Sequence, residues 1–193
     1  RPRPDSAGSC GPVRFLFSGQ LIPRKGVDVL LQAFAQLSSR FREEATAPRL
    51  VLLGDGDKRA EYEAMTPASL RSRVEFRGFC DPGDLPREFA TSDVFILPSR
   101  HDGWGVVVNE AIGAGMPVIA SSAVGAAHDL IEPGQNGYLV SPGDADDLAS
   151  AMSCFALQPE RVAIFGRRSR EIALNWTVER GAQRWHEVCE HVL

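Results

Sequence analysis

The segment SDVFILPSRHDGWGVVVNEAIGAGMPVIAS, residues 92–121, decides the fold class because it holds a complete strand–helix–strand unit. Two short runs that are apolar throughout, 94–97 and 118–120, are typical of strands buried on both faces. Between them, a helical stretch begins after two glycines, Gly103 and Gly105. Because parallel strands need a crossover connection of this kind, the unit predicts a parallel sheet covered by helices.

The same alternation continues in both directions from this segment. The apolar residues of 27–37 recur at helical spacing between two further strands, and this predicts a helix with one buried face. The other predicted strands are 13–17, 50–53, 74–76 and 138–140, and the last predicted helices are 144–157, 159–173 and 177–192. The predicted fold class is therefore α/β, a doubly wound parallel sheet.

Composition bounds the class of protein and its partners. The 193 residues carry a formal net charge of -4, so no global basic field attracts nucleic acid or an anionic membrane. The four cysteines lack CxxC spacing or a clustered histidine, which argues against a zinc site and a disulfide framework. No run of about 18 apolar residues and no export signal is found, and a cytoplasmic protein is expected.

Ligands of open α/β sheets bind beyond the carboxyl ends of the strands, so the loops there carry the functional signal. The loop after the first strand, 18–26, contains Gly19 and the adjacent cations Arg24 and Lys25. A phosphate clamp and a solvated basic loop explain this pair about equally well. The turn after the second strand, 54–57, lacks the third glycine of a dinucleotide fingerprint.

The loop after 94–97 is the richest in candidate residues. Gly103 and Gly105 leave the backbone open where a helix begins, so its N–H groups can face an anion. Glu110 lies in a helix whose neighbours are nearly all apolar, and we expect this helix to be mostly buried. The carboxylate then needs partners, which are either ligand hydroxyls or a neighbouring loop.

The remaining aromatic and histidine side chains have open interpretations. Trp104 either packs beneath a ligand or anchors its glycine-rich loop, and His101 is either solvated or a ligand contact. Trp176 and Trp185 are predicted to be packing residues of the last helices.

Four motifs, in order and at the expected separations, resemble glycosyltransferase family 4, whose members have the GT-B fold. The similarity covers roughly residues 13–155, and the motifs are FSGQLIPRKGVDVLLQAF, RLVLLGDGD, VEFRGF and the segment quoted first. The resemblance implies a Rossmann-like C-terminal donor-binding domain at 13–175. It also implies an interdomain linker remnant at 1–12 and, at 176–193, a helix that crosses back to an absent N-terminal domain.

The resemblance also implies roles for individual residues. The second glutamate of the family's Glu-x7-Glu motif matches Glu110, which would bind the ribose, and the first is replaced by Asp102, which would contact the donor sugar. Lys25 would bind the diphosphate, and Arg24 is the candidate substitute for a family arginine that is Gln20 here. Lys25, Arg24, Asp102 and Glu110 form the predicted catalytic set. Further donor contacts are predicted at Gly19, Gln20, Phe76, Gly78, Phe79, Gly103, Trp104, Gly105 and Val106.

The activity that the resemblance implies is retaining transfer of a sugar from a UDP- or GDP-type donor to a glycan or lipid-linked acceptor. Such transfer fits cell-surface polysaccharide or lipopolysaccharide synthesis. No cofactor and no metal is expected, and the full-length enzyme is expected to associate peripherally with the inner face of the membrane. Because the acceptor would bind the missing domain, the isolated chain is expected to be inactive.

Two other classes remain as alternatives to this prediction. An NAD-dependent oxidoreductase needs GxGxxG after the first strand, and residues 19–26 do not fit it. A non-catalytic nucleotide-binding module is compatible with the departures at Gln20 and Asp102, although Lys25 and Glu110 are retained.

Overall fold

The computed structural model describes residues 11–192, and the side chains of residues 11–190. Most of the linker predicted at 1–12 therefore lies outside the described residues, as does Cys10. Within the described part, six parallel strands form one sheet in the order β3-β2-β1-β4-β5-β6. The strands are β1 (Arg14–Ser18), β2 (Arg49–Leu53), β3 (Val74–Gly78), β4 (Val94–Leu97), β5 (Val118–Ser121) and β6 (Gly137–Val140).

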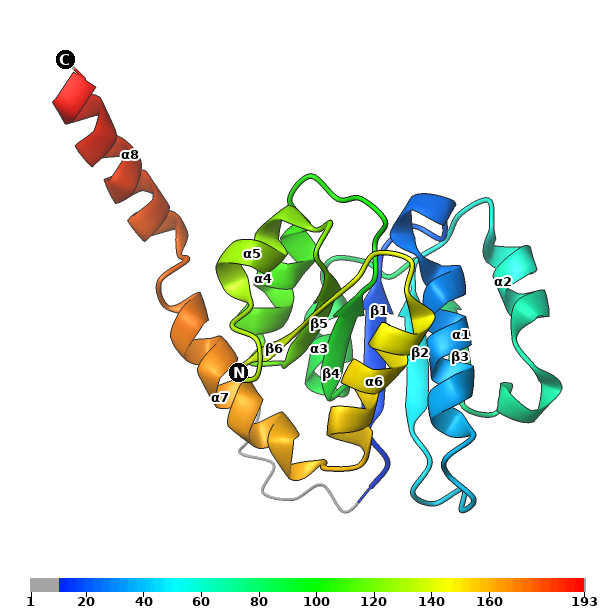
Figure 1. Cartoon of the computed structure of the whole chain (residues 1–193). Coiled ribbons are helices and arrows are strands. Elements are labelled where there is room, and N and C mark those ends of the chain that lie inside the picture. Colours follow the sequence, from blue (N-terminus) through cyan, green and yellow to red (C-terminus); the bar gives the residue numbers. More distant parts are fainter. Residues whose placement is uncertain (1–10, 193) are drawn as a thin grey trace.

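Helices cover both faces of this sheet, which confirms the doubly wound α/β prediction (Figure 1). The helix α1 packs against α2 and α6 on one face, whereas α4 packs against α5 and α7 on the other. Right-handed crossovers dictate this division, because the chain leaves β1 toward one edge of the sheet and leaves β4 toward the opposite edge. The α-helices are α1 (Val27–Ser38), α2 (Arg59–Met65), α3 (Leu85–Ala90), α4 (Val106–Gly113), α5 (Gly125–Leu130), α6 (Ala145–Ala156), α7 (Glu160–Ala173) and α8 (Val178–Val192), and two 3-10 turns are η1 (Pro23–Lys25) and η2 (Ala68–Leu70).

The core lies between the sheet and these helices. Every residue of β4 and β5 is buried, as expected for central strands that are covered on both faces. The largest fully buried side chains include Phe15, Phe17 and Phe95 from the central strands and Phe34 from α1. Burial of such large apolar side chains supplies the main favourable term of folding.

The strand order reverses between β1 and β4, and this reversal positions the site. The chain continues from β1 to β2 on one side and from β4 to β5 on the other. The loops that follow β1 and β4 therefore lead toward opposite edges, and their start at the carboxyl edge of the sheet is the usual ligand position in such folds. We call this position the switch point; the loops that flank it are residues 19–26 and 98–105.

The helix α8 differs from the rest of the molecule because it extends away from the sheet (Figure 1). The prediction that Trp185 is a packing residue is wrong for the described chain, since its side chain is 72% exposed. The described side chains of α8 are all exposed, whereas the Trp176 ring before this helix lies 5.9 Å from that of Trp104. A search of the described helices finds none that is long and apolar enough to cross a membrane.

Candidate functional site

The loop after β1 carries the two predicted cations on a tight turn pressed against the loop after β4. Gly26 ends this turn with a left-handed backbone, φ 70°, and its N–H donates to the Pro23 carbonyl. A Cβ atom added to Gly26 would lie 2.2 Å from the Pro98 carbonyl oxygen. Only glycine allows this approach, so Gly26 holds Arg24 and Lys25 beside the loop after β4.

Lys25 and Asp102 form a mostly buried ion pair across the switch point. The Lys25 Nζ lies 2.5 Å from Asp102 Oδ2, and each side chain is 13% exposed. Arg24 stands at the rim with its Nη1 3.9 Å from the other Asp102 oxygen, and it donates to the His101 carbonyl at 2.9 Å. The structure thus brings together three of the four predicted catalytic residues. Lys25 and Asp102 are 77 positions apart in the sequence.

The loop after β4 is itself held by the loop after β5. The Asp102 N–H donates to the Ala123 carbonyl at 3.0 Å, and the Gly125 N–H donates to the Asp102 carbonyl at 3.1 Å. Gly125 has no room for a side chain, since a Cβ atom there would lie 2.2 Å from the Gly103 carbonyl oxygen. These contacts fix the backbone from which Asp102 reaches Lys25.

The same loop leads into α4 through Gly105, whose backbone is left-handed with φ 85°. A Cβ atom at this position would lie 2.7 Å from Val124 Cγ1. No side chain caps this helix end, and the Val108 N–H donates to the Gly105 carbonyl at 2.8 Å. The N–H groups before it and the positive dipole end of the helix are available to an anion.

Glu110 is exposed, and the prediction that its helix is mostly buried is wrong for one face of α4. Val108, Ala111 and Ile112 are buried, whereas Val106 is 63% exposed and lies one helical turn before Glu110. The sequence of α4 hid this division, because apolar residues such as Val106 also lie on its exposed face.

The Glu110 carboxylate has no hydrogen-bond or ion-pair partner within the described residues. Partial burial raises its pKa above the ordinary value, and no nearby charge contributes to that shift. A carboxylate that is partly desolvated and unpartnered can accept hydrogen bonds from ligand hydroxyls.

Gly19 and Gln20 occupy different positions beside the cations. Gly19 borders Lys25, because a Cβ atom at residue 19 would lie 3.7 Å from Lys25 Cε. The Gln20 side chain is exposed and forms no hydrogen bond with the residues that the structure describes. Gln20 is therefore free to meet a ligand but adds no charge to the switch point.

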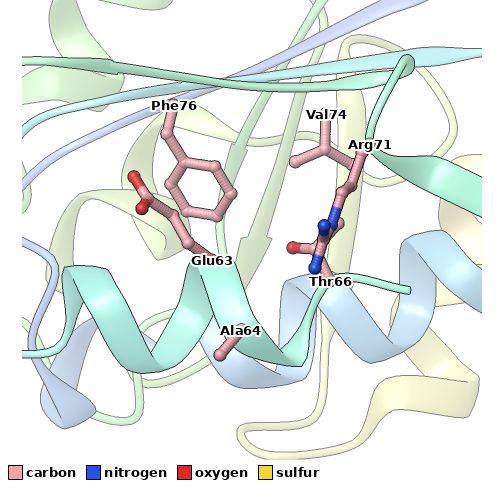
Figure 2. A pocket seen from close by; sticks show the side chains of 6 residues that line it. All are labelled: Glu63, Ala64, Thr66, Arg71, Val74 and Phe76. Carbon is pink, nitrogen blue, oxygen red and sulfur yellow. The ribbon is translucent and has the colours of Figure 1, made fainter. Parts of the chain in front are cut away.

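The predicted contacts from β3 divide into two groups. Gly78 ends the strand at the carboxyl edge with a left-handed backbone, φ 75°. Its carbonyl accepts a hydrogen bond from the Gly54 N–H at 2.7 Å. The next residue, Phe79, is 75% exposed. The Phe76 ring instead points toward α2 and lines a hollow of about 390 Å³ (Figure 2). The other residues around this hollow are Glu63, Ala64, Thr66, Arg71 and Val74.

Trp104 and His101 lie on the loop after β4 with exposed side chains. The Trp104 Nε1 donates to Asn109 Oδ1 at 2.8 Å, so the indole is tied to the first turns of α4. For His101, the structure gives a role to the backbone carbonyl, which accepts from Arg24.

Arg100 was given no role from the sequence. It directly follows the buried Ser99 and binds Asp28 through both terminal nitrogens of its guanidinium. The available signal was a cation at the carboxyl end of a central strand, next to the reversal of strand order. Among the described residues, no group of three or more His, Cys, Asp or Glu side chains has metal-binding geometry.

Comparisons with known proteins identify the family. A family model for glycosyl transferases group 1 matches residues 6–172. The chain is 33% identical over 163 residues to a GDP-mannose-dependent alpha-mannosyltransferase of Mycobacterium tuberculosis, covering 84% of this chain and 39% of that protein. It is 31% identical over 146 residues to the alpha-D-kanosaminyltransferase of Streptomyces kanamyceticus, covering 75% of this chain and 36% of that enzyme.

Solved structures agree with this result. Anabaena HepE in complex with UDP-glucose superposes with a TM-score of 0.77 at 27% identity, covering 93% of this chain and 49% of that one. Sucrose-phosphate synthase from Thermosynechococcus elongatus gives a TM-score of 0.78 at 28% identity, covering 98% and 46%. The chain spans less than half the length of each of these four relatives. It belongs to the glycosyl transferases group 1 family, and its six-stranded Rossmann-like domain matches GT-B glycosyltransferases.

Proposed function

We propose that this chain is the donor-binding half of a retaining family 4 glycosyltransferase that uses a nucleotide-diphosphate sugar. The observation that carries the proposal is the meeting of Lys25, Arg24 and Asp102 at the switch point, in front of an uncapped helix end. Two cations and a helix N-terminus form a site for a diphosphate, and a carboxylate beside them can accept sugar hydroxyls.

The diphosphate would replace Asp102 as the partner of Lys25. In the structure the two side chains form an ion pair, and a bond from Lys25 to phosphate oxygens would be charge-assisted in the same way. Donor binding would then free the Asp102 carboxylate at the position where the sugar sits. This single exchange of partners would place Lys25 on the diphosphate and leave Asp102 free to bind the sugar.

Catalysis would consist mainly of stabilising the departing diphosphate. Its negative charge grows as the glycosidic bond breaks, so Lys25, Arg24 and the amides of α4 stabilise the transition state more than the bound donor. Glu110 would accept hydrogen bonds from the ribose hydroxyls. The end of β3 would cradle the base through main-chain groups near Gly78.

The acceptor would come from outside the described chain. We expect a glycan or lipid-linked acceptor bound by a second domain. Correct placement of two reactants supplies roughly 7 to 11 kcal/mol of a barrier, and the chain alone provides only the donor side. The 193 residues by themselves are therefore expected to bind the donor without transferring sugar.

Calorimetric titration with UDP, GDP, ADP and NAD tests the donor class. UDP or GDP should bind, and NAD should not. Preferential binding of NAD would overturn the proposal in favour of an oxidoreductase.

The ribose assignment is tested with Glu110→Ala and 2′-deoxy-UDP in a double-mutant cycle. Each change alone should weaken binding by about 1.5 kcal/mol, roughly tenfold. The variant with 2′-deoxy-UDP should lose little more binding free energy than either single change does. Glu160→Ala is the control, because Glu160 is an exposed glutamate at the start of α7, away from the switch point. Additive losses would show that Glu110 does not contact the 2′-hydroxyl of the ribose.

A further inference from the structure

Arg100 joins the two loops of the switch point through its side chain. Its Nη1 and Nη2 donate to the two carboxylate oxygens of Asp28 in α1 at 2.8 and 2.7 Å. The same Nη1 also donates to the Pro23 carbonyl at 2.8 Å. One guanidinium therefore binds both the first residue of η1 and the helix that follows this turn.

The backbone around Arg100 completes the connection. The Arg100 N–H donates to the Arg24 carbonyl at 2.8 Å, and the Arg24 Nη1 returns a bond to the His101 carbonyl at 2.9 Å. The turn that carries Arg24 and Lys25 is thus bound to the β4 loop at its start, along its backbone and through one of its own side chains.

The energetics of the Arg100–Asp28 pair favour a geometric role over a stabilising one. The side chains are 41% and 32% exposed, and exposed ion pairs contribute little to stability. A bidentate pair does fix the orientation of the guanidinium relative to the carboxylate, which a lysine in the same place cannot do. The hydrogen bonds from Arg100 lower the pKa of Asp28, so the carboxylate remains charged throughout the neutral range.

We infer that Arg100 is a positioning residue for the diphosphate site, acting through Asp28 and the η1 turn to aim Lys25 and Arg24 at the N-terminus of α4. This inference rests on the proposed function, since it assigns those two cations to the diphosphate. Arg100 itself does not touch the donor, because its guanidinium is occupied by Asp28 and Pro23.

The chain offers a matched control in Arg168, which binds Glu132 through two nitrogens at 2.7 and 2.8 Å. Both of these side chains are 38% exposed; Arg168 lies on α7 and Glu132 in the loop after α5, outside the switch-point loops. Arg100→Lys and Arg168→Lys therefore each remove a bidentate arginine–carboxylate pair and keep the positive charge.

The first measurement is the affinity for UDP relative to uridine in the 193-residue chain. Arg100→Lys should lower UDP affinity about three- to tenfold, the range for coupled neighbours, and leave uridine affinity unchanged. Asp28→Asn should do the same, and the double variant should be no weaker than either single one. Arg168→Lys should change neither affinity.

The second measurement needs no ligand. Hydrogen exchange should become several-fold faster in Arg100→Lys at the amides of Lys25 and Gly26, which bond within the turn at 3.0 and 3.2 Å. Exchange in α7 should stay as in the parent. Faster exchange there as well would indicate general destabilisation and overturn the assignment.

Equal losses for UDP and uridine, or unchanged exchange in the η1 turn, would also overturn the positioning role. A parent chain that binds UDP no better than uridine would instead overturn the proposed function. In that case Arg100 has no role in diphosphate binding, whatever the hydrogen-exchange experiment shows.

Discussion

The switch point and the end of β3 were both predicted to contact the donor, yet they are built differently. At the switch point, residues from two distant loops meet, and Lys25 and Asp102 are mostly buried against each other. At the end of β3, the edge strand of the sheet, Phe79 is exposed and the Phe76 ring lines a separate hollow.

This difference follows from where each residue lies relative to the end of its strand. Lys25 and Asp102 come after β1 and β4, and the carboxyl ends of neighbouring parallel strands meet at one edge. Phe76 lies inside β3, where alternate side chains are directed to the faces of the sheet. Position past the end of a strand, more than residue type, decides which candidates converge.

The strongest test of the switch point is Lys25→Ala. UDP affinity should fall by about 3 kcal/mol, roughly a hundredfold, because a charge-assisted bond to phosphate is lost, while uridine affinity should stay within about twofold. Titration calorimetry with both ligands measures the difference. Equal losses for the two ligands would remove Lys25 from the diphosphate site.

The end of β3 is tested by a pair of substitutions with opposite expected results. Phe79→Ala should lower UDP affinity by about 1 kcal/mol, the low end for stacking of a base on an exposed ring, without loss of stability. Phe76→Ala should lower the free energy of unfolding by about 2 kcal/mol, less than for a fully buried ring, and leave UDP affinity unchanged. Urea unfolding and calorimetry on both variants would separate them. A loss of affinity in Phe76→Ala alone would reverse this assignment.

Much of the fold could be predicted from the sequence. Runs such as VFIL in β4 are apolar throughout, and this pattern specifies a strand buried on both faces. The alternation of strands and helices then implies a parallel sheet. The order of the strands depends on which edges pair in three dimensions, and no single segment encodes it.

The site was predicted less completely, for physical reasons. The loop position of Lys25 and Asp102 marked them as candidates, but their direct pairing depends on the adjacency of β1 and β4. The exposed side of Glu110 was hidden because its helix contains valines on both faces. Trp185 was predicted to pack from its residue type alone, although α8 leaves the domain.

Glu110, in α4, is a third case: its carboxylate has no partner among the described residues, and this predicts a small pH effect. Burial raises its pKa above the ordinary 4.5, so the folded state holds the proton more tightly than the unfolded chain does. Stability is therefore lost as the pH rises through the raised pKa, and the ionised carboxylate is slightly destabilising at neutral pH.

Glu110→Gln should consequently raise the free energy of unfolding at about pH 7 by less than about 0.5 kcal/mol, the usual range at exposed positions. The gain should vanish at about pH 4, where the parent carboxyl is protonated. Urea unfolding at both pH values measures it. A less stable variant at neutral pH would mean that the carboxylate has a partner in the folded protein.

The smallest expected effect is that of removing divalent cations, and it tests whether the switch point alone neutralises the diphosphate. Lys25, Arg24 and the first amides of α4 already supply positive charge there, and Asp102, the nearest carboxylate, is occupied by Lys25. UDP affinity should therefore agree within about twofold in EDTA and in excess Mg²⁺, while it should fall with added salt because ion pairs are screened. Affinity that is lost in EDTA and regained with Mg²⁺ or Mn²⁺ would show that a metal does this work. Asp102→Asn would then identify the ligand: if the variant loses the metal response and keeps its affinity for uridine, Asp102 binds the cation and is not held by Lys25 when the donor is present.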